Sequence, residues 1–385
     1  MSRRKKVKEQ KPSNTEPTNL RRYGHYLKDE KPKVPKSFFI TEEERNNSID
    51  LMRKIFEVQS VSYDTGVMQG FLLSFIKSLK DNTIEYYFDD SGNFYVRKGY
   101  AKTYPCIVSH IDTVHDIIPQ KDYKVLNSEK EFFAVDLSTR GSTGIGGDDK
   151  CGIYCCLDNL LKEEVIKLAF FVDEEVGCQG SHDADMHFFS DVSFVLQADR
   201  QGYNDVACVI LGTEMFGVDF LSKIETTLDY FNRDLVSGGM TDVMQLAHNG
   251  LGIAMANFSC GYYNPHSKYE YVVIDELIAT SYLFGQIITD VWRDGYIEEF
   301  ERDEDYDYGY GVHYGNSYSE LLSDKDEYTP NFNGECSKCG CMTTYDHDWG
   351  LNYCNNCMDY DYNSYKKTLT SDRDRLDNGL DTRIY

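Results

Sequence analysis

The chain has 385 residues and a mass of 44.4 kDa, enough for one sizeable domain and a smaller module, because single cores stop growing near about 250 to 300 residues. The formal charge of −24 argues against general binding to nucleic acid or anionic membranes, since most of the surface would repel a polyanion. The basic start is followed by no apolar stretch of about 18 residues, so we predict a cytoplasmic protein with no membrane contact.

Residues 1–36 are polar and rich in Lys and Pro, and they are predicted to form a basic disordered tail. Residues 1–34 contain eleven Lys and Arg against four Asp and Glu, an excess of seven positive charges. The tail is therefore either a solubilising arm or a tether for a polyanion, and it is the one place where nucleic acid could bind.

A helix with an acidic first turn is predicted from Thr41, and a second helix from Val67 to Leu79. Two strands, Ile84–Phe88 and Asn93–Arg97, form a predicted hairpin. Short apolar runs then alternate with helical patterns, which predicts a three-layer αβα sandwich around a mixed, mostly parallel sheet. These runs span residues 104–109, 153–161, 166–172, 192–197, 243–247, 252–257 and 274–292.

Side chains that bind metals follow several of these predicted strands. His110 ends the run 104–109, and alternation places Asp112 on the same face, where its carboxylate could orient the imidazole. Asp199 follows the run 192–197, and His266 comes after the run 252–257. Because ligands gather at the carboxyl ends of strands in α/β sheets, these residues are expected to share one site.

Two acidic motifs complete the set. The turn Gly144–Gly152 brings the adjacent carboxylates of Asp148 and Asp149 to a helix start, which favours a cation over a phosphate. Glu174 and Glu175 end an apolar strand and point in opposite directions, so one can ligate a metal while the other acts as a base. A His, Asp, Glu, Asp and His in this order suit zinc or a similar ion.

The sequence resembles the co-catalytic zinc exopeptidases that include peptidase T, the glutamate carboxypeptidases and the leucyl and glutamyl aminopeptidases. The resemblance covers roughly residues 45–295. The matching segments are His110-Ile111-Asp112-Thr113-Val114, Gly147-Asp148-Asp149-Lys150-x-Gly152, Asp173-Glu174-Glu175-Val176-Gly177, Asp199, and Asn264-Pro265-His266-Ser267 with Glu270, together with Asp90-x-Gly92-Asn93-Phe94-Tyr95-Val96 and Gly239-Met240-Thr241-Asp242.

The resemblance implies a role for each metal-binding residue. Asp148 would bridge two zinc, cobalt or manganese ions, with His110 and Asp199 on one ion and Glu175 and His266 on the other. The remaining roles follow the same resemblance. Asp112 would support His110, Glu174 would be the general base, and Gly239, Thr241 and Asp242 would contact substrate.

We therefore predict an exopeptidase that removes a terminal amino acid from short peptides, using a two-metal-activated water. In the resembling family, Asp at position 199 favours aminopeptidase action. The alternatives are a deacylase or carboxypeptidase acting on N-acyl amino acids, and a non-catalytic interaction protein that uses the fold as a scaffold. The intervals between the ligands are too short for a helix-rich lid, so residues 37–296 are expected to be the catalytic domain alone.

The C-terminal part is predicted to contain a separate zinc module. Residues 297–331 form an acidic, Tyr-rich linker, residues 332–360 a zinc ribbon, and residues 361–385 a polar tail. Two Cys-x-x-Cys pairs at ribbon spacing would hold one structural zinc ion. Their cysteines are Cys336, Cys339, Cys354 and Cys357. Because Asp and Tyr flank the ribbon, a protein partner is favoured over nucleic acid.

Overall fold

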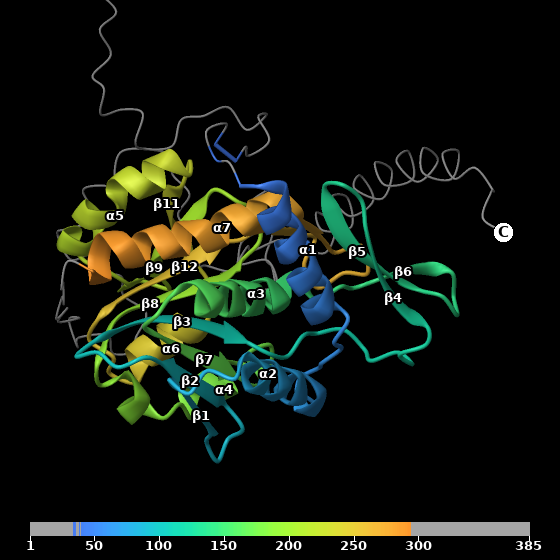
Figure 1. Cartoon of the computed structure of the whole chain (residues 1–385), viewed down its shortest axis with the longest axis horizontal. Coiled ribbons are helices and arrows are strands. Elements are labelled where there is room, and N and C mark those ends of the chain that lie inside the picture. The colour runs from blue at the N-terminus through green and yellow to red at the C-terminus, as the bar shows by residue number, and fades with distance from the viewer. Residues whose placement is uncertain (1–33, 36–37, 39, 294–385) are drawn as a thin grey trace, which may run out of the picture. The chain divides into compact units, whose positions relative to one another are not determined.

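The computed structural model describes residues 34–35, 38 and 40–293 (Figure 1). The predicted linker, the zinc ribbon with Cys336, Cys339, Cys354 and Cys357, the polar C-terminal tail and nearly all of the basic tail lie outside the described residues. Within the described part, none of the helices has the length and apolar character needed to cross a membrane.

The first two predicted helices are present. Helix α1 (Glu42–Phe56) begins at Thr41, whose hydroxyl accepts the Glu44 N–H at 3.1 Å while the Glu44 carboxylate accepts the Thr41 N–H at 2.7 Å. This reciprocal pair is the capping box that satisfies two otherwise free donors. Helix α2 (Gly66–Leu79) follows, and then the hairpin of β1 (Ile84–Phe88) and β2 (Phe94–Lys98) forms one edge of the large sheet.

The large sheet has nine strands, ordered β1-β2-β7-β3-β8-β12-β9-β10, with β11 paired to β9. Its central strands β7, β3, β8 and β12 run parallel and are almost wholly buried, as expected for a sheet covered on both faces. The remaining bounds are β3 (Tyr104–His110), β7 (Ile166–Phe171), β8 (Val192–Arg200), β9 (Asp205–Ile210), β10 (Thr213–Glu214), β11 (Asp234–Gly238) and β12 (Ala254–Ser259).

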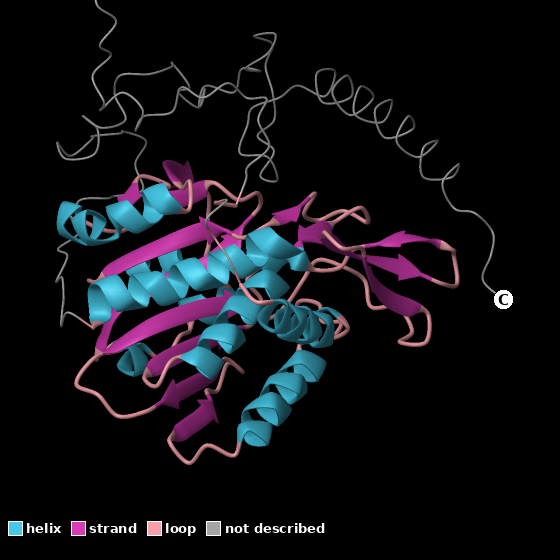
Figure 2. Ribbon diagram, turned by 45° about the horizontal axis from the view of Figure 1, so that its top comes forward, coloured by secondary structure: helices cyan, strands magenta, loops and turns pink. Residues whose placement is uncertain are grey.

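Helices cover both faces of this sheet (Figures 1 and 2). Helices α3 and α7 pack together over one face, and the shorter α4 and α6 lie behind the strands in Figure 1. The predicted αβα fold class is therefore confirmed. The helix bounds are α3 (Gly147–Lys162), α4 (Gln179–His182), a 3-10 turn (Met186–Phe189), α5 (Val218–Tyr230), α6 (Asp242–His248) and α7 (Ile274–Ile287), which continues as a π-helical turn (Ile288–Trp292).

A second sheet has five strands, and three of them lie in an interval where no strand had been predicted from the sequence. Strands β4, β5 and β6 lie between His110 and Asp148, and β5 pairs with β14 and through it with β13. Their bounds are β4 (Tyr123–Asn127), β5 (Glu131–Asp136), β6 (Gly141–Thr143), β13 (Tyr262–Tyr263) and β14 (Tyr271–Val273). The three strands project from the body in Figure 2 as a small β arm, and buried side chains of β4 and β5 belong to the main hydrophobic core.

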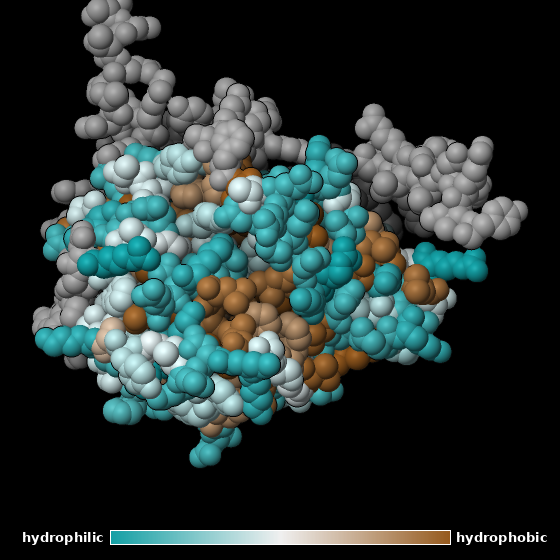
Figure 3. All heavy atoms as spheres, viewed as in Figure 1, coloured by the Kyte–Doolittle hydropathy of each residue, from teal (hydrophilic) through white to brown (hydrophobic). Residues whose placement is uncertain are grey.

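The face seen in Figure 3 is mostly hydrophilic, and hydrophobic side chains gather in its middle and toward the projecting strands. On the arm, Leu126 and Leu137 are among the exposed large hydrophobic side chains. The polar residues singled out in the sequence lie elsewhere, at the carboxyl ends of β3, β7 and β8 and in the adjoining turns. The parallel pairing of these strands brings those ends to one edge of the sheet.

Candidate metal centre

The last residue of β3, His110, forms the floor of the site. The residue is 1% exposed, and the two nitrogens of its imidazole face different partners. Nδ1 lies 3.0 Å from the carbonyl oxygen of Asp112 and 3.4 Å from its carboxylate. Nε2 faces the other way, 3.1 Å from Asp148 Oδ1 and 3.7 Å from Asp199 Oδ1. The contacts of Nδ1 with Asp112 therefore fix the orientation of the imidazole ring and leave Nε2 to bind a metal ion.

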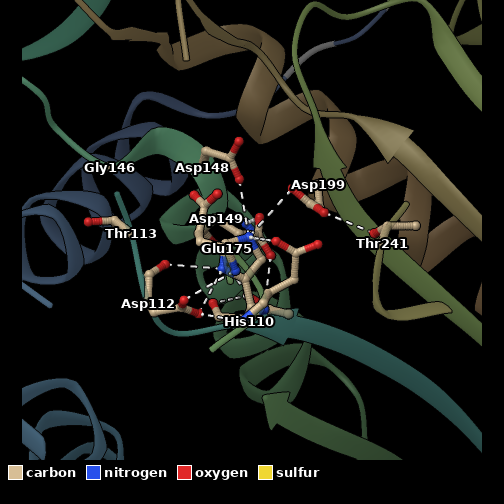
Figure 4. A network of polar contacts seen from close by, with 12 residues as sticks. His110, Asp112, Thr113, Gly146, Asp148, Asp149, Glu175, Asp199 and Thr241 are labelled. Carbon is tan, nitrogen blue, oxygen red and sulfur yellow. Dashed lines mark hydrogen bonds and ion pairs between the residues drawn. The ribbon is translucent and has the colours of Figure 1, made fainter. Parts of the chain in front are cut away.

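The two oxygens of Asp148 face two different histidines. Oδ1 lies near His110, and Oδ2 lies 3.3 Å from His266 Nε2. The same His266 nitrogen is 3.2 Å from Glu175 Oε2. Asp148 thus stands between two groups of ligand atoms, and Figure 4 shows Asp148, Asp199 and Glu175 converging on His110.

Two groups of three side chains could each hold a metal ion. The first is His110, Asp148 and Asp199, and the second is Asp148, Glu175 and His266. In each group the three ligand atoms all lie within 4.8 Å of one another. The structure thus brings together all five residues that the sequence had indicated as metal ligands.

The chemistry of these groups fits divalent cations. Imidazole nitrogens combined with carboxylate oxygens suit zinc and neighbouring transition metals. Glu175 Oε1 is buried and has no hydrogen-bond partner among the described residues, which costs free energy unless a cation binds there. A metal ion in the second group would supply that missing partner.

Electrostatics within the site also favour a cation. Burial lowers the pKa of His110, but the surrounding carboxylates, Asp112 foremost, outweigh burial and raise that pKa well above its usual range. Hydrogen bonds with Asp148 and Glu175 raise the pKa of His266 to about 11. Burial and the charge of Asp148 raise the pKa of Asp199 to about 7. The carboxylates therefore favour protons on His110 and His266, which metal ions would displace.

The Asp112 carboxylate joins three parts of the site. Besides facing His110, it accepts the backbone N–H of Glu174 at 3.0 Å and that of Glu175 at 3.3 Å. The Ser62 hydroxyl donates to it at 2.7 Å. Sequence reasoning had predicted the contact with His110 but missed Ser62, which lies far from the motifs and carries no local signal of its own.

Glu174, the predicted general base, borders the first group of ligands. Its Oε2 lies 3.9 Å from His110 Nε2, and its Oε1 lies 3.3 Å from the thiol of Cys178, which donates to it. Burial, together with the charges of Asp199 and Asp242, raises the pKa of Glu174 well above its usual range. A carboxyl group with a raised pKa is suited to proton transfer near neutral pH.

A buried polar network holds Asp199. Its Oδ2 lies 3.0 Å from the Thr241 hydroxyl, its N–H donates to Asn257 Oδ1 at 2.9 Å, and Gln197 Nε2 donates to both Asp199 and Asp242. Thr241 and Asp242 are buried and face this network, and Gly239 is exposed. Contact of Gly239, Thr241 and Asp242 with substrate stays a prediction.

The second acid of the pair, Asp149, points into the protein. Its Oδ1 accepts the Gly152 N–H at 2.8 Å, and its Oδ2 accepts the His110 N–H at 3.3 Å. The carboxylate therefore caps the start of α3 and supports the end of β3. Among the described residues, Asp148 therefore belongs to both candidate groups, and Asp149, whose carboxylate points inward, belongs to neither.

Comparison with curated proteins gives partial relatives, and no family model matches the chain. A probable carboxypeptidase of Arthroderma gypseum is 32% identical over 162 residues, which cover 37% of this chain and 33% of that protein. A probable carboxypeptidase of Arthroderma benhamiae is 31% identical over 151 residues, covering 34% and 32%. The chain spans about a third of the length of the curated relatives it matches.

Solved structures resemble most of the described part. Aminopeptidase PepT from Bacillus cereus matches with a TM-score of 0.50 and 15% identity, covering 64% of this chain and 98% of that one. The aminopeptidase APDkam598 from the archaeon Desulfurococcus kamchatkensis matches with a TM-score of 0.50 and 16% identity, covering 64% and 95%. At this identity, the likeness shows that the chain shares the fold of these peptidases.

Proposed function

We propose that the chain is a metal-dependent exopeptidase that removes a terminal amino acid from short peptides. The observation that carries the proposal is the shared position of Asp148. Its two oxygens face His110 and His266, and the buried carboxyl group of Glu174 stands beside the first of them. Zinc, cobalt or manganese bound by the two groups would polarise the substrate carbonyl and activate water.

The chain's own residues would then move the proton. Glu174 Oε2 is the oxygen that faces the centre, while Cys178 occupies Oε1. Oε2 would take the proton of the attacking water and return it to the leaving amine. Asp112 positions both Glu174 and His110 through its hydrogen bonds, so it would act on the reaction through these neighbours.

The comparisons with known proteins bear on which end of the peptide is cleaved. The two solved structures named above are aminopeptidases, which favours release of the N-terminal residue. The curated relatives are called probable carboxypeptidases, which makes a carboxypeptidase or a deacylase of N-acyl amino acids the second candidate.

A set of end-blocked peptides tests the proposal. The full chain, freed of metal and then supplied with Zn²⁺, Co²⁺ or Mn²⁺, is incubated with one tripeptide in unblocked, N-acetylated and C-amidated forms. An aminopeptidase cleaves the unblocked and C-amidated forms, and a carboxypeptidase cleaves the unblocked and N-acetylated forms. Failure to bind metal or to cleave any form would instead favour a non-catalytic scaffold. The variant Glu174→Gln serves as the inactive control.

A further inference from the structure

A buried carboxylate outside both candidate groups holds the turn that carries Asp148. Glu270 is 1% exposed. Its Oε2 accepts the Gly146 N–H at 2.7 Å, and its Oε1 accepts the Asp148 N–H at 3.1 Å. Both backbone donors lie in one short turn, so the Glu270 carboxylate fixes where the main chain delivers Asp148.

The Glu270 carboxylate also contacts the side chain of His115. Its Nε2 lies 2.8 Å from Glu270 Oε2, and it is the donor because an ionised carboxylate can only accept. The imidazole lies against Gly144: a Cβ built on that glycine would come within 2.1 to 2.3 Å of three ring atoms. Glycine at this position therefore leaves the space that the ring needs to reach Glu270.

The His115–Glu270 pair connects the segments that supply three of the candidate ligands. His115 follows His110 by five residues on the segment after β3. Glu270 follows His266 by four residues, between β13 and β14. The two side chains meet at the turn before Asp148. A hydrogen-bonded pair at such a junction can set the relative positions of the ligands without touching an ion.

We propose that His115 is a positioning residue for the metal centre and acts on Asp148 through Glu270. The proposal rests on the metal-dependent function proposed above. Because Asp148 belongs to both groups of ligand atoms, a displaced Asp148 weakens the binding of both ions together. If the pair is merely a structural contact, its loss lowers stability and leaves metal affinity unchanged.

Metal binding by the full chain gives the decisive measurement. Mn²⁺ is a suitable probe because carboxylate and imidazole ligands accept it, whereas thiolates such as those of the predicted ribbon favour zinc. Free Mn²⁺ is followed by its paramagnetic resonance signal during titration of metal-free protein. His115→Leu should weaken the binding of both ions by about 10- to 100-fold, the usual effect of losing a residue that orients ligands.

Conservative variants separate positioning from general damage. His115→Gln can present an amide N–H where Nε2 lies and should bind Mn²⁺ nearly as well as the wild type, whereas the shorter His115→Asn should resemble His115→Leu. His182 provides the matched control, since its side chain is exposed, lies 2.8 Å from Asp183 and belongs to neither candidate group. His182→Leu should leave both affinities unchanged.

A glycine variant tests the same contact with His115 still in place. Gly144→Ala puts a methyl group where the imidazole lies, so it should weaken Mn²⁺ binding in the same way as His115→Leu. Gly66→Ala is its control, because a Cβ there meets no atom within 4 Å. Thermal unfolding without metal checks that each variant folds.

Two results would overturn the positioning role. The first is a folded His115→Leu or Gly144→Ala protein with unchanged Mn²⁺ affinity, and the second is a His115→Gln protein as weak as His115→Leu. If the wild type binds no Mn²⁺, Co²⁺ or Zn²⁺ in the described domain, the metal centre itself is wrong and the positioning role is lost with it. If the wild type binds metal but hydrolyses no peptide, only the proposed activity fails.

Discussion

Glu174 and Glu175 are neighbours in the chain, yet their carboxylates have different surroundings. Glu175 Oε2 lies 3.2 Å from His266 within the second group of ligand atoms, and its Oε1 is buried without a partner in the described residues. Glu174 Oε1 accepts from the Cys178 thiol, and its Oε2 faces the centre. Asp112 binds the backbone N–H of both residues and so keeps the two carboxylates in these separate places.

This difference predicts two distinct phenotypes. Glu174→Ala should keep both metal ions but lower turnover by a factor on the order of 10² to 10⁴, because only proton transfer is removed. Glu175→Ala should lower metal occupancy as well as activity, since a ligand is lost. Metal analysis and steady-state rates on the two proteins make the comparison. Loss of metal from Glu174→Ala with retention in Glu175→Ala would reverse the assignment.

Metal binding should release protons. The pKa of His266 is raised to about 11 by Asp148 and Glu175, so the ring carries a proton at pH 7 that a metal ion must displace. Apparent affinity should therefore rise with pH, by about tenfold per pH unit for each proton released. Calorimetric titration in two buffers of different ionisation enthalpy counts these protons. Equal binding enthalpies in both buffers would contradict the expectation, and His266→Ala should reduce the count.

Because of Lys150, the free energy of unfolding should change with pH in the alkaline range. Its ammonium group is buried 2.9 Å from the Ile145 carbonyl oxygen, and burial lowers its pKa from 10.5 to about 8. Between about pH 8 and 10.5, Lys150 is protonated in the unfolded chain and neutral in the folded chain. The unfolding free energy therefore rises with pH across this range, and this gain is complete above about pH 10.5 and lost as the pH falls through about 8.

Comparison with Lys150→Met isolates this contribution. As the pH rises from 8 to 10.5, the wild type should gain up to about 3 kcal/mol in unfolding free energy relative to the variant, given about 1.4 kcal/mol per pKa unit. Urea unfolding of both proteins in the presence of a chelator measures the difference. A constant difference across this range would show that Lys150 is not desolvated as the structure has it.

The predicted zinc ribbon should be separable from the candidate metal centre. Removing residues 332–385 should lower the zinc content from about three ions per chain to about two, since four thiolates are lost and the five ligands of the main domain remain. Hydrolysis of small peptides should largely persist. Metal analysis and peptide assays on the shortened chain check both points, and loss of all activity would argue against independent modules.

The elements with strong local signals could be predicted from the sequence. The acidic first turn after Thr41 predicted the start of α1, and the turn after Phe88 separates β1 from β2 as expected. The apolar runs that became β3, β7 and β8 were found because strands buried on both faces are almost continuously hydrophobic. Their polar ends then indicated His110, Glu175 and Asp199, whereas Asp148 and His266 lie outside these strands.

Features that depend on tertiary pairing were missed. The β arm was not expected, because β4 has the alternating burial of a half-exposed strand and β14, which joins the arm by pairing with β5, lies far along the chain. Local helix propensity could not distinguish Asp148 from Asp149 either, since both lie in the first turn of α3. The family resemblance was the reason for choosing Asp148 as the metal ligand. In the structure, the Gly152 N–H and the end of β3 hold Asp149 inside the protein.

The order of strands in the large sheet also governs when the site can assemble during synthesis. His110, Asp148 and Asp199 are all made before β12, and the pairing of β3 with β8 is enough to bring two of them together. His266 follows β12, so the second group of ligands is complete only after almost the whole described domain has been synthesised. An ion that binds only the native arrangement stabilises it by mass action. Binding of the proposed ion to the second group would therefore come after β12 has joined the sheet, and it would stabilise the folded domain late in synthesis.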